Sequence, residues 1–168
     1  MTLPADPNEL SIRERLMQHL KLRFEDAQAG NIVRLQDGST TTLSTTWNTV
    51  SRKPLTKEQL RFGDVLALFD STESKTSDIG TVRSSLLVVI EFFTQAKMGD
   101  EPSSVLNQML LDVQHLMNVD RTCGGLCLDI RETSNELSVD GPGDNILGGM
   151  ARFEILYRHR AASPRVPR

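Results

Sequence analysis

Aromatic residues are scarce in this chain of 168 residues, which has six Phe, one Trp and one Tyr. A nucleic-acid reader that stacks bases on aromatic platforms would need more of them. The sequence also lacks a membrane segment, because its longest apolar run covers residues 86–90, far short of the ~20 residues that a span requires. The opening stretch, MTLPADPNEL, has neither the basic nor the apolar region of a signal peptide. We therefore expect a soluble protein, made in the cytoplasm, that uses no membrane.

Cysteine is rare as well, since Cys123 and Cys127 are the only thiols. One pair does not build a disulfide framework, and a reducing compartment is expected. Together with His115 and His159 these thiols could bind zinc, but structural zinc sites need a second closely spaced ligand pair, which the scattered histidines do not supply. We favour two small residues that bracket a glycine turn, and we predict no metal site there.

Catalytic and phosphate-binding motifs are missing: the sequence has no G-x-S-x-G, no H-E-x-x-H, no kinase signature and no glycine-rich phosphate loop. Four acids, Asp64, Asp70, Glu73 and Asp78, could hold Mg²⁺ or Ca²⁺ weakly. Their spacing is not that of an EF-hand loop, so solvated carboxylates are the simpler interpretation. We predict that the protein is not an enzyme, has no cofactor, and works through its surfaces, with weak Mg²⁺ binding by the loop acids as the alternative.

Charge is distributed unevenly along the chain, whose net charge is −3. The last eleven residues contain Arg158, Arg160, Arg165 and Arg168 and no acid, so the rest of the chain carries 15 basic and 22 acidic side chains. An acidic body argues against tight wrapping of nucleic acid. It is compatible with a surface past which DNA slides without binding.

Two amphipathic helices and one long strand are the clearest elements. Ser11 and Glu14 have the spacing of a capping box, and helical periodicity follows up to a stop at Gly30. A second helix is expected over residues 102–118, with Asp100 as its cap. Residues 81–97 predict a strand.

The remaining elements are shorter. Strands are expected at 46–51, 65–69, 126–130 and 149–159, and a strand or extended loop with a turn at Asp37-Gly38 precedes them. We also expect a helical turn capped by Thr56 and a polar, mobile loop at 70–80. The order predicts a single α+β domain over residues 11–160, in which a mixed or antiparallel sheet packs against the two amphipathic helices. Residues 1–10 are expected to be a flexible leader and residues 161–168 a disordered basic tail.

The long strand has two apolar faces. Its even positions form one continuous apolar face, whereas its odd positions mix polar side chains with Leu87, Val89 and Phe93. A solvated face should not hold three large apolar residues, so a second layer or a neighbouring subunit must cover them. We favour a helix as the cover, and a subunit interface is the alternative.

Five segments of the chain follow one another in an order typical of a known family: SIRERLMQHLKLRFEDA, VSRKPLTKEQLRFGDVLALFDSTES, RSSLLVVIEFFTQA, EPSSVLNQMLLDVQHLMNVD and CGGLCLDIRETSNELSVDGPGDNILGGMARFEILYRHR. They resemble the tail terminator proteins (minor tail protein U-like, tail completion proteins) of long-tailed bacteriophages, and the resemblance covers residues 11–160. The resemblance rests on the order of the helices and strands and on their residue patterns, without a short diagnostic motif. The stretch 31–46 is longer than the family pattern.

The resemblance implies a virion protein that assembles as a homohexameric ring on the head-proximal end of the tail tube. Such a ring stops tube polymerisation, binds head completion or connector proteins, and lets DNA pass through its lumen without specific binding. Loops carry function on a rigid scaffold, so the predicted loops at 36–46 and 70–80 are candidates for contacts with the tube or the head. Their candidate contact residues are Asp37, Ser39, Thr41, Glu73, Lys75 and Asp78.

Three other classes remain open. A head closure or head–tail joining protein of the connector would form a ring of different size or symmetry. A small metal-dependent hydrolase or nuclease would use the loop acids, and a monomeric binding module would form no ring.

Overall fold

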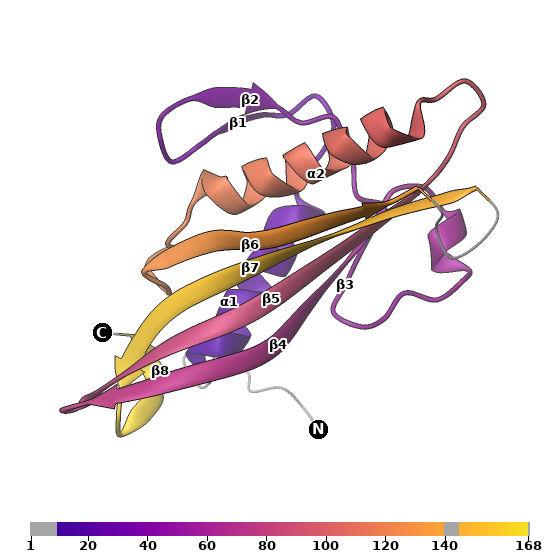
Figure 1. Cartoon of the computed structure of the whole chain (residues 1–168). Coiled ribbons are helices and arrows are strands. Elements are labelled where there is room, and N and C mark those ends of the chain that lie inside the picture. The colour runs from indigo at the N-terminus through magenta and orange to yellow at the C-terminus, as the bar shows by residue number, and fades with distance from the viewer. Residues whose placement is uncertain (1–9, 140–144, 168) are drawn as a thin grey trace.

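A computed structural model describes residues 10–139 and 145–167, so the predicted leader lies almost wholly outside the described residues. The chain forms two helices, α1 (Ile12–Glu25) and α2 (Pro102–Val119), and a short 3₁₀ helix, η2 (Gln59–Arg61). The strands are β1 (Ile32–Arg34), β2 (Thr40–Thr42), β3 (Thr49–Ser51), β4 (Val65–Asp78), β5 (Thr81–Gln95), β6 (Asp129–Ser138), β7 (Ile146–Arg160) and β8 (Ser163–Pro167) (Figure 1).

The main sheet has the strand order β3-β4-β5-β7-β6, and β8 pairs with the end of β7. β3 runs parallel to β4, while the other neighbours are antiparallel. β1 and β2 form a separate hairpin above α2 (Figure 1). The predicted α+β class, with a mixed sheet against two amphipathic helices, is confirmed.

Both helices form where the periodicity predicts them, but their ends differ in detail. The Ser11 hydroxyl accepts the backbone N–H of Glu14 at 3.2 Å, as a capping residue should. α1 ends at Glu25, well before Gly30, whose amide instead donates to the Leu43 carbonyl at 2.8 Å. The predicted cap of α2 is also wrong: Glu101 takes the N-cap position, and the Asp100 carboxylate accepts the amide of Lys97.

The predicted mobile loop at 70–80 is a strand. β4 continues to Asp78 and pairs with β5 across a bulge between Asp70 and Glu73, so Ile79 and Gly80 form the turn. The polar stretch after Ile130 is likewise paired, as β6 against β7. Pairing satisfies the backbone N–H and C=O groups of these stretches, and their polar side chains stay in solvent.

The predicted disordered tail also forms a strand over most of its length. Residues 161–162 turn the chain back, and β8 then pairs with β7 at His159 and Arg160. β6 pairs with β7 only as far as Leu156, so the end of β7 has an unpaired edge that β8 occupies. Arg168 lies outside the described residues.

One hydrophobic core lies between the helices and one face of the sheet. It joins the buried stripes of α1 and α2 to the even positions of β5 and the odd positions of β7. Trp47 sits at its centre, with ring centroids 6.3 Å from Phe24 of α1 and 6.5 Å from Phe92 of β5, both in edge-to-face geometry. In Figure 1, α1 crosses behind the strands.

Candidate interaction face of the sheet

The second face of the sheet, which we call the open face, is covered by neither α1 nor α2. It consists of the odd positions of β5 and the register partners of those positions on β4 and β7. Leu87, Val89 and Phe93 all lie on it and are half-buried. The expectation that one of the two amphipathic helices covers these residues is wrong, because α1 and α2 pack on the opposite face. The short helix η2 contacts β5, and the register partner of Phe93 on β4, Val65, is fully buried.

Apolar side chains form a patch over the middle of the open face. A Cβ added at Gly148 would come within 2.8 Å of the Phe93 ring, so this ring lies directly over the glycine of the neighbouring strand. Phe69 is the register partner of Val89. Met150 and Leu156, the register partners of Glu91 and Ser85, are diagonal neighbours of Val89 and Leu87 on the same face. These side chains are half-buried, and an apolar patch that solvent partly reaches is a candidate interaction site.

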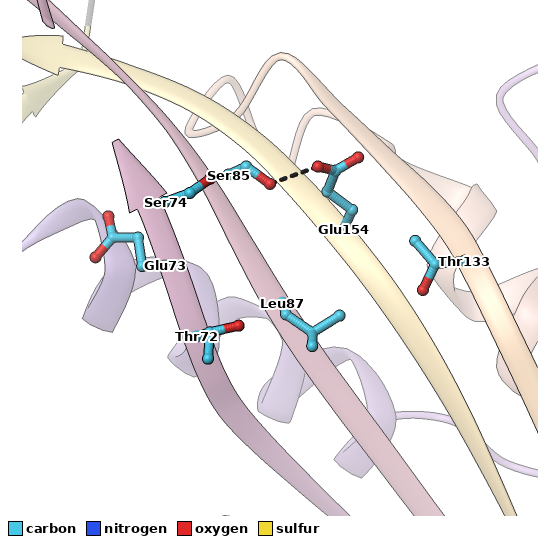
Figure 2. Close-up of a pocket in the computed structure, with 7 residues that line it drawn as sticks. All are labelled: Thr72, Glu73, Ser74, Ser85, Leu87, Thr133 and Glu154. Atoms are coloured by element: carbon cyan, nitrogen blue, oxygen red, sulfur yellow. Dashed lines mark hydrogen bonds between the residues drawn. The ribbon is translucent and has the colours of Figure 1, made fainter. Parts of the chain in front are cut away.

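Polar residues interrupt the patch at a shallow hollow of about 290 Å³ (Figure 2). The Ser85 hydroxyl donates to the Glu154 carboxylate at 2.5 Å, and Leu87 lies beside them. The hollow is lined by Thr72, Glu73, Ser74, Ser85, Leu87, Thr133 and Glu154. The open face therefore has a depression, and a protruding side chain of another molecule can enter this hollow.

A second hollow, of about 260 Å³, adjoins the first and shares Ser74 and Ser85 with it. It contains Arg83 and Arg158, which are direct register partners on β5 and β7. Sequence reasoning missed this pair. Which residues of two strands face each other depends on register, and register is set by tertiary pairing.

The candidate contact residues Asp37, Ser39 and Thr41 lie elsewhere, on the β1–β2 hairpin. The Asp37 carboxylate accepts the Ser39 hydroxyl at 2.6 Å and its amide at 2.9 Å, and these hydrogen bonds lower the pKa of Asp37. Thr41 Oγ1 is 3.4 Å from His115 Nδ1 on α2. This hairpin thus sits on the helical side of the molecule, away from the open face.

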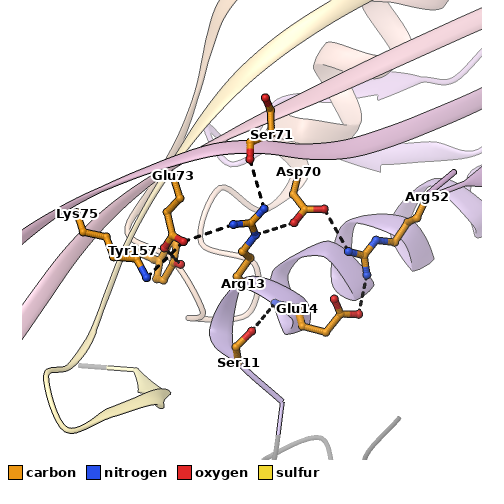
Figure 3. A network of polar contacts seen from close by, with 9 residues as sticks. All are labelled: Ser11, Arg13, Glu14, Arg52, Asp70, Ser71, Glu73, Lys75 and Tyr157. Atoms are coloured by element: carbon orange, nitrogen blue, oxygen red, sulfur yellow. Dashed lines mark hydrogen bonds and ion pairs between the residues drawn. The ribbon is translucent and has the colours of Figure 1, made fainter. Parts of the chain in front are cut away.

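Glu73, Lys75 and Asp78 lie on strand β4. Tyr157 donates its hydroxyl to Glu73, and Lys75 Nζ is 3.5 Å from the same carboxylate (Figure 3). Burial alone would raise the pKa of Glu73, but the hydrogen bond from Tyr157 and the charge of Lys75 outweigh it, so the pKa is lowered. Glu73 is therefore engaged in the fold, while Lys75 and Asp78 are exposed near the hairpin turn.

A network of ion pairs fastens α1 to the bulge of β4 (Figure 3). Arg13 Nε donates to Asp70 at 2.6 Å, and Arg13 Nη1 lies 3.5 Å from Glu73. Arg52 lies 2.6 Å from Glu14 and 3.3 Å from Asp70, so it joins the chain before η2 to the same cluster. Burial would raise the pKa of Asp70, yet the two arginines lower it. The bulge is thereby held at one place relative to the helix.

The groups considered for metal binding are dispersed. Cys123 and Cys127 are buried free thiols in the turn after α2, and Cys127 Sγ donates to the Arg121 carbonyl at 3.2 Å. The hydrogen bond with Cys123, together with burial, raises the pKa of Cys127. Within residues 10–139 and 145–167, no three His, Cys, Asp or Glu side chains gather as metal ligands would.

No protein-family model matches the chain, and no curated protein matches its sequence. Among the described residues, neither helix is long and apolar enough to cross a membrane.

Proposed function

We propose that this protein is a structural assembly protein of a long-tailed bacteriophage, which caps the head-proximal end of the tail tube as a homohexameric ring. The ring stops tube polymerisation and offers the surface to which head completion proteins bind, while DNA passes through the lumen. The observation that carries the proposal is the open face, where Leu87, Val89 and Phe93 are half-buried and lie under neither α1 nor α2.

Ring closure requires a contact between two different surfaces of neighbouring copies. The apolar patch of the open face supplies one such surface, and burying it in an assembly removes apolar area from water. The paired ends of β4 and β5, which lie beside β8 at one end of the sheet (Figure 1), supply a projecting element for the other. A head closure or head–tail joining protein is the second candidate, because its ring would use the same two features.

The first experiment is to measure mass by light scattering across a concentration series, with and without Mg²⁺, followed by negative-stain imaging. We expect a particle of six times 18.7 kDa with a central hole. Leu87→Glu should abolish the particle, because a charge in an apolar interface is poorly solvated. Leu111→Glu on α2, where the leucine is 41% exposed and lies off the open face, is the matched control and should assemble normally.

A monomer in solution is not decisive, since many assembly proteins form rings only on their template. Binding to the ends of purified tail tubes is therefore the second readout. A chain that stays monomeric and also fails to bind tube ends would overturn the proposal. A ring that binds connectors but not tubes would favour the joining protein instead.

A further inference from the structure

Arg83 and Arg158 form an unusual pair on the open face. They are direct register partners on β5 and β7, and both side chains lie on the same side of the sheet. Residues opposite each other on antiparallel strands have Cβ atoms about 4.5–5.5 Å apart, and like charges at that position destabilise the sheet. Within the described part of the chain, neither arginine makes a salt bridge.

The surroundings of the pair are those of an anion site. Ser74, Thr76 and Ser85 line the same hollow and bring hydroxyl groups to it. The Nε of Arg158 is shielded from solvent, and no group of residues 10–139 and 145–167 accepts a hydrogen bond from it. A buried donor without an acceptor is costly, and an oxyanion in the hollow would supply the acceptor.

We propose that Arg83 and Arg158 bind a carboxylate side chain presented by an acidic segment of a partner protein. The guanidinium fork matches a carboxylate with two parallel hydrogen bonds. Leu128 and Leu156 also line the hollow, so an apolar residue next to the acid can pack beside it. The site does not depend on the proposed ring, because any acidic partner segment can occupy it.

A nucleic-acid phosphate is the less favoured ligand. Glu154 lines the adjoining hollow, so a continuous polyanion along this face would meet its carboxylate. A single carboxylate side chain can bind the arginine pair without extending into that adjoining hollow.

The test is to follow the arginine Nε–Hε signals by NMR on the full chain. The probe is an acetylated, amidated peptide Gly-Glu-Leu-Glu-Gly, and the matched control peptide is Gly-Gln-Leu-Gln-Gly. We expect the signals of Arg83 and Arg158 to shift saturably with the first peptide alone. The signal of Arg131 should stay still, because Asp129 already binds it at 3.0 Å.

Variants complete the test. Arg158→Gln and Arg83→Gln should each weaken peptide binding by about tenfold or more, since each removes a charge-assisted hydrogen bond. Arg131→Gln is the control and should bind as the parent does. The exposed Arg83 gives a variant that folds even where the half-buried Arg158 does not tolerate change.

Two results would overturn the assignment. One is an absence of shifts at peptide concentrations of about 10 mM, which corresponds to negligible affinity. The other is a response to single-stranded oligothymidylate that exceeds the response to the peptide, which would make the ligand a nucleic acid. Either result is independent of whether the protein forms a ring.

Discussion

Replacing Asp70 by asparagine tests whether the network between α1 and the β4 bulge stabilises the fold. The substitution keeps the shape of the side chain and removes its charge. It thereby weakens the contact with Arg13 at 2.6 Å and that with Arg52 at 3.3 Å. Both arginines keep a second carboxylate, Glu73 and Glu14 respectively, so neither is left without a partner.

The size of the effect follows from the two contacts. A hydrogen bond to a charged group contributes about 1.5–3 kcal/mol when it is well shielded. Here the side chains of Arg13, Arg52 and Asp70 are 35%, 26% and 24% exposed, so solvent screening reduces each contribution. The asparagine oxygen still accepts one hydrogen bond. We therefore expect Asp70→Asn to lower the free energy of unfolding by about 1–2 kcal/mol at neutral pH.

The difference in stability between the parent and Asp70→Asn should depend on pH in one direction. The folded pKa of Asp70 lies below its ordinary value, so its carboxylate contributes stability above the unfolded pKa of about 4. That contribution disappears as the pH falls through the lower folded pKa. The gap between parent and variant should thus be largest at neutral pH and should close in strong acid.

Urea unfolding followed by the fluorescence of Trp47, the single tryptophan and a buried one, measures both quantities. Glu136→Gln is the control, because this exposed carboxylate of β6 has no ion pair among the described residues. A gap of the same size at neutral and strongly acidic pH would refute the ion-pair argument. So would a variant as stable as the control at neutral pH.

Two further substitutions probe the sheet. Gly149→Ala should destabilise the fold by about 1–3 kcal/mol through overpacking, because its Cβ would lie 2.4 Å from the buried Phe92 ring and 2.8 Å from Leu137. Calorimetric melting measures the loss of stability. An unchanged melting temperature would contradict the packing described. Ile79→Ser, at a turn residue that is 98% exposed, should leave the melting temperature unchanged and reduce ring formation measured by light scattering. Normal ring formation would remove the hairpin turn from the proposed contact between neighbouring copies.

Sequence periodicity predicted the elements that bury an apolar stripe. α1, α2 and β5 form where such stripes occur, because burial of a stripe is what stabilises each of them. The outer half of β4 has no stripe: its residues from Ser74 to Asp78 are exposed, and their strand conformation depends on pairing with β5. β6 follows the same rule with β7. Polar strands of this kind look like loops until their partners are known.

The sequence alone did not determine which face of the sheet would form the candidate site. Parity along β5 identified two apolar faces, but it could not tell which face the helices would take. α1 precedes the sheet and α2 joins β5 to β6, and in the folded chain both lie on the side of Phe92. Leu87, Val89 and Phe93 are consequently left on a face that solvent reaches. Because burying this patch in an assembly would remove apolar area from water, its position supports the proposal that other copies or partners cover it.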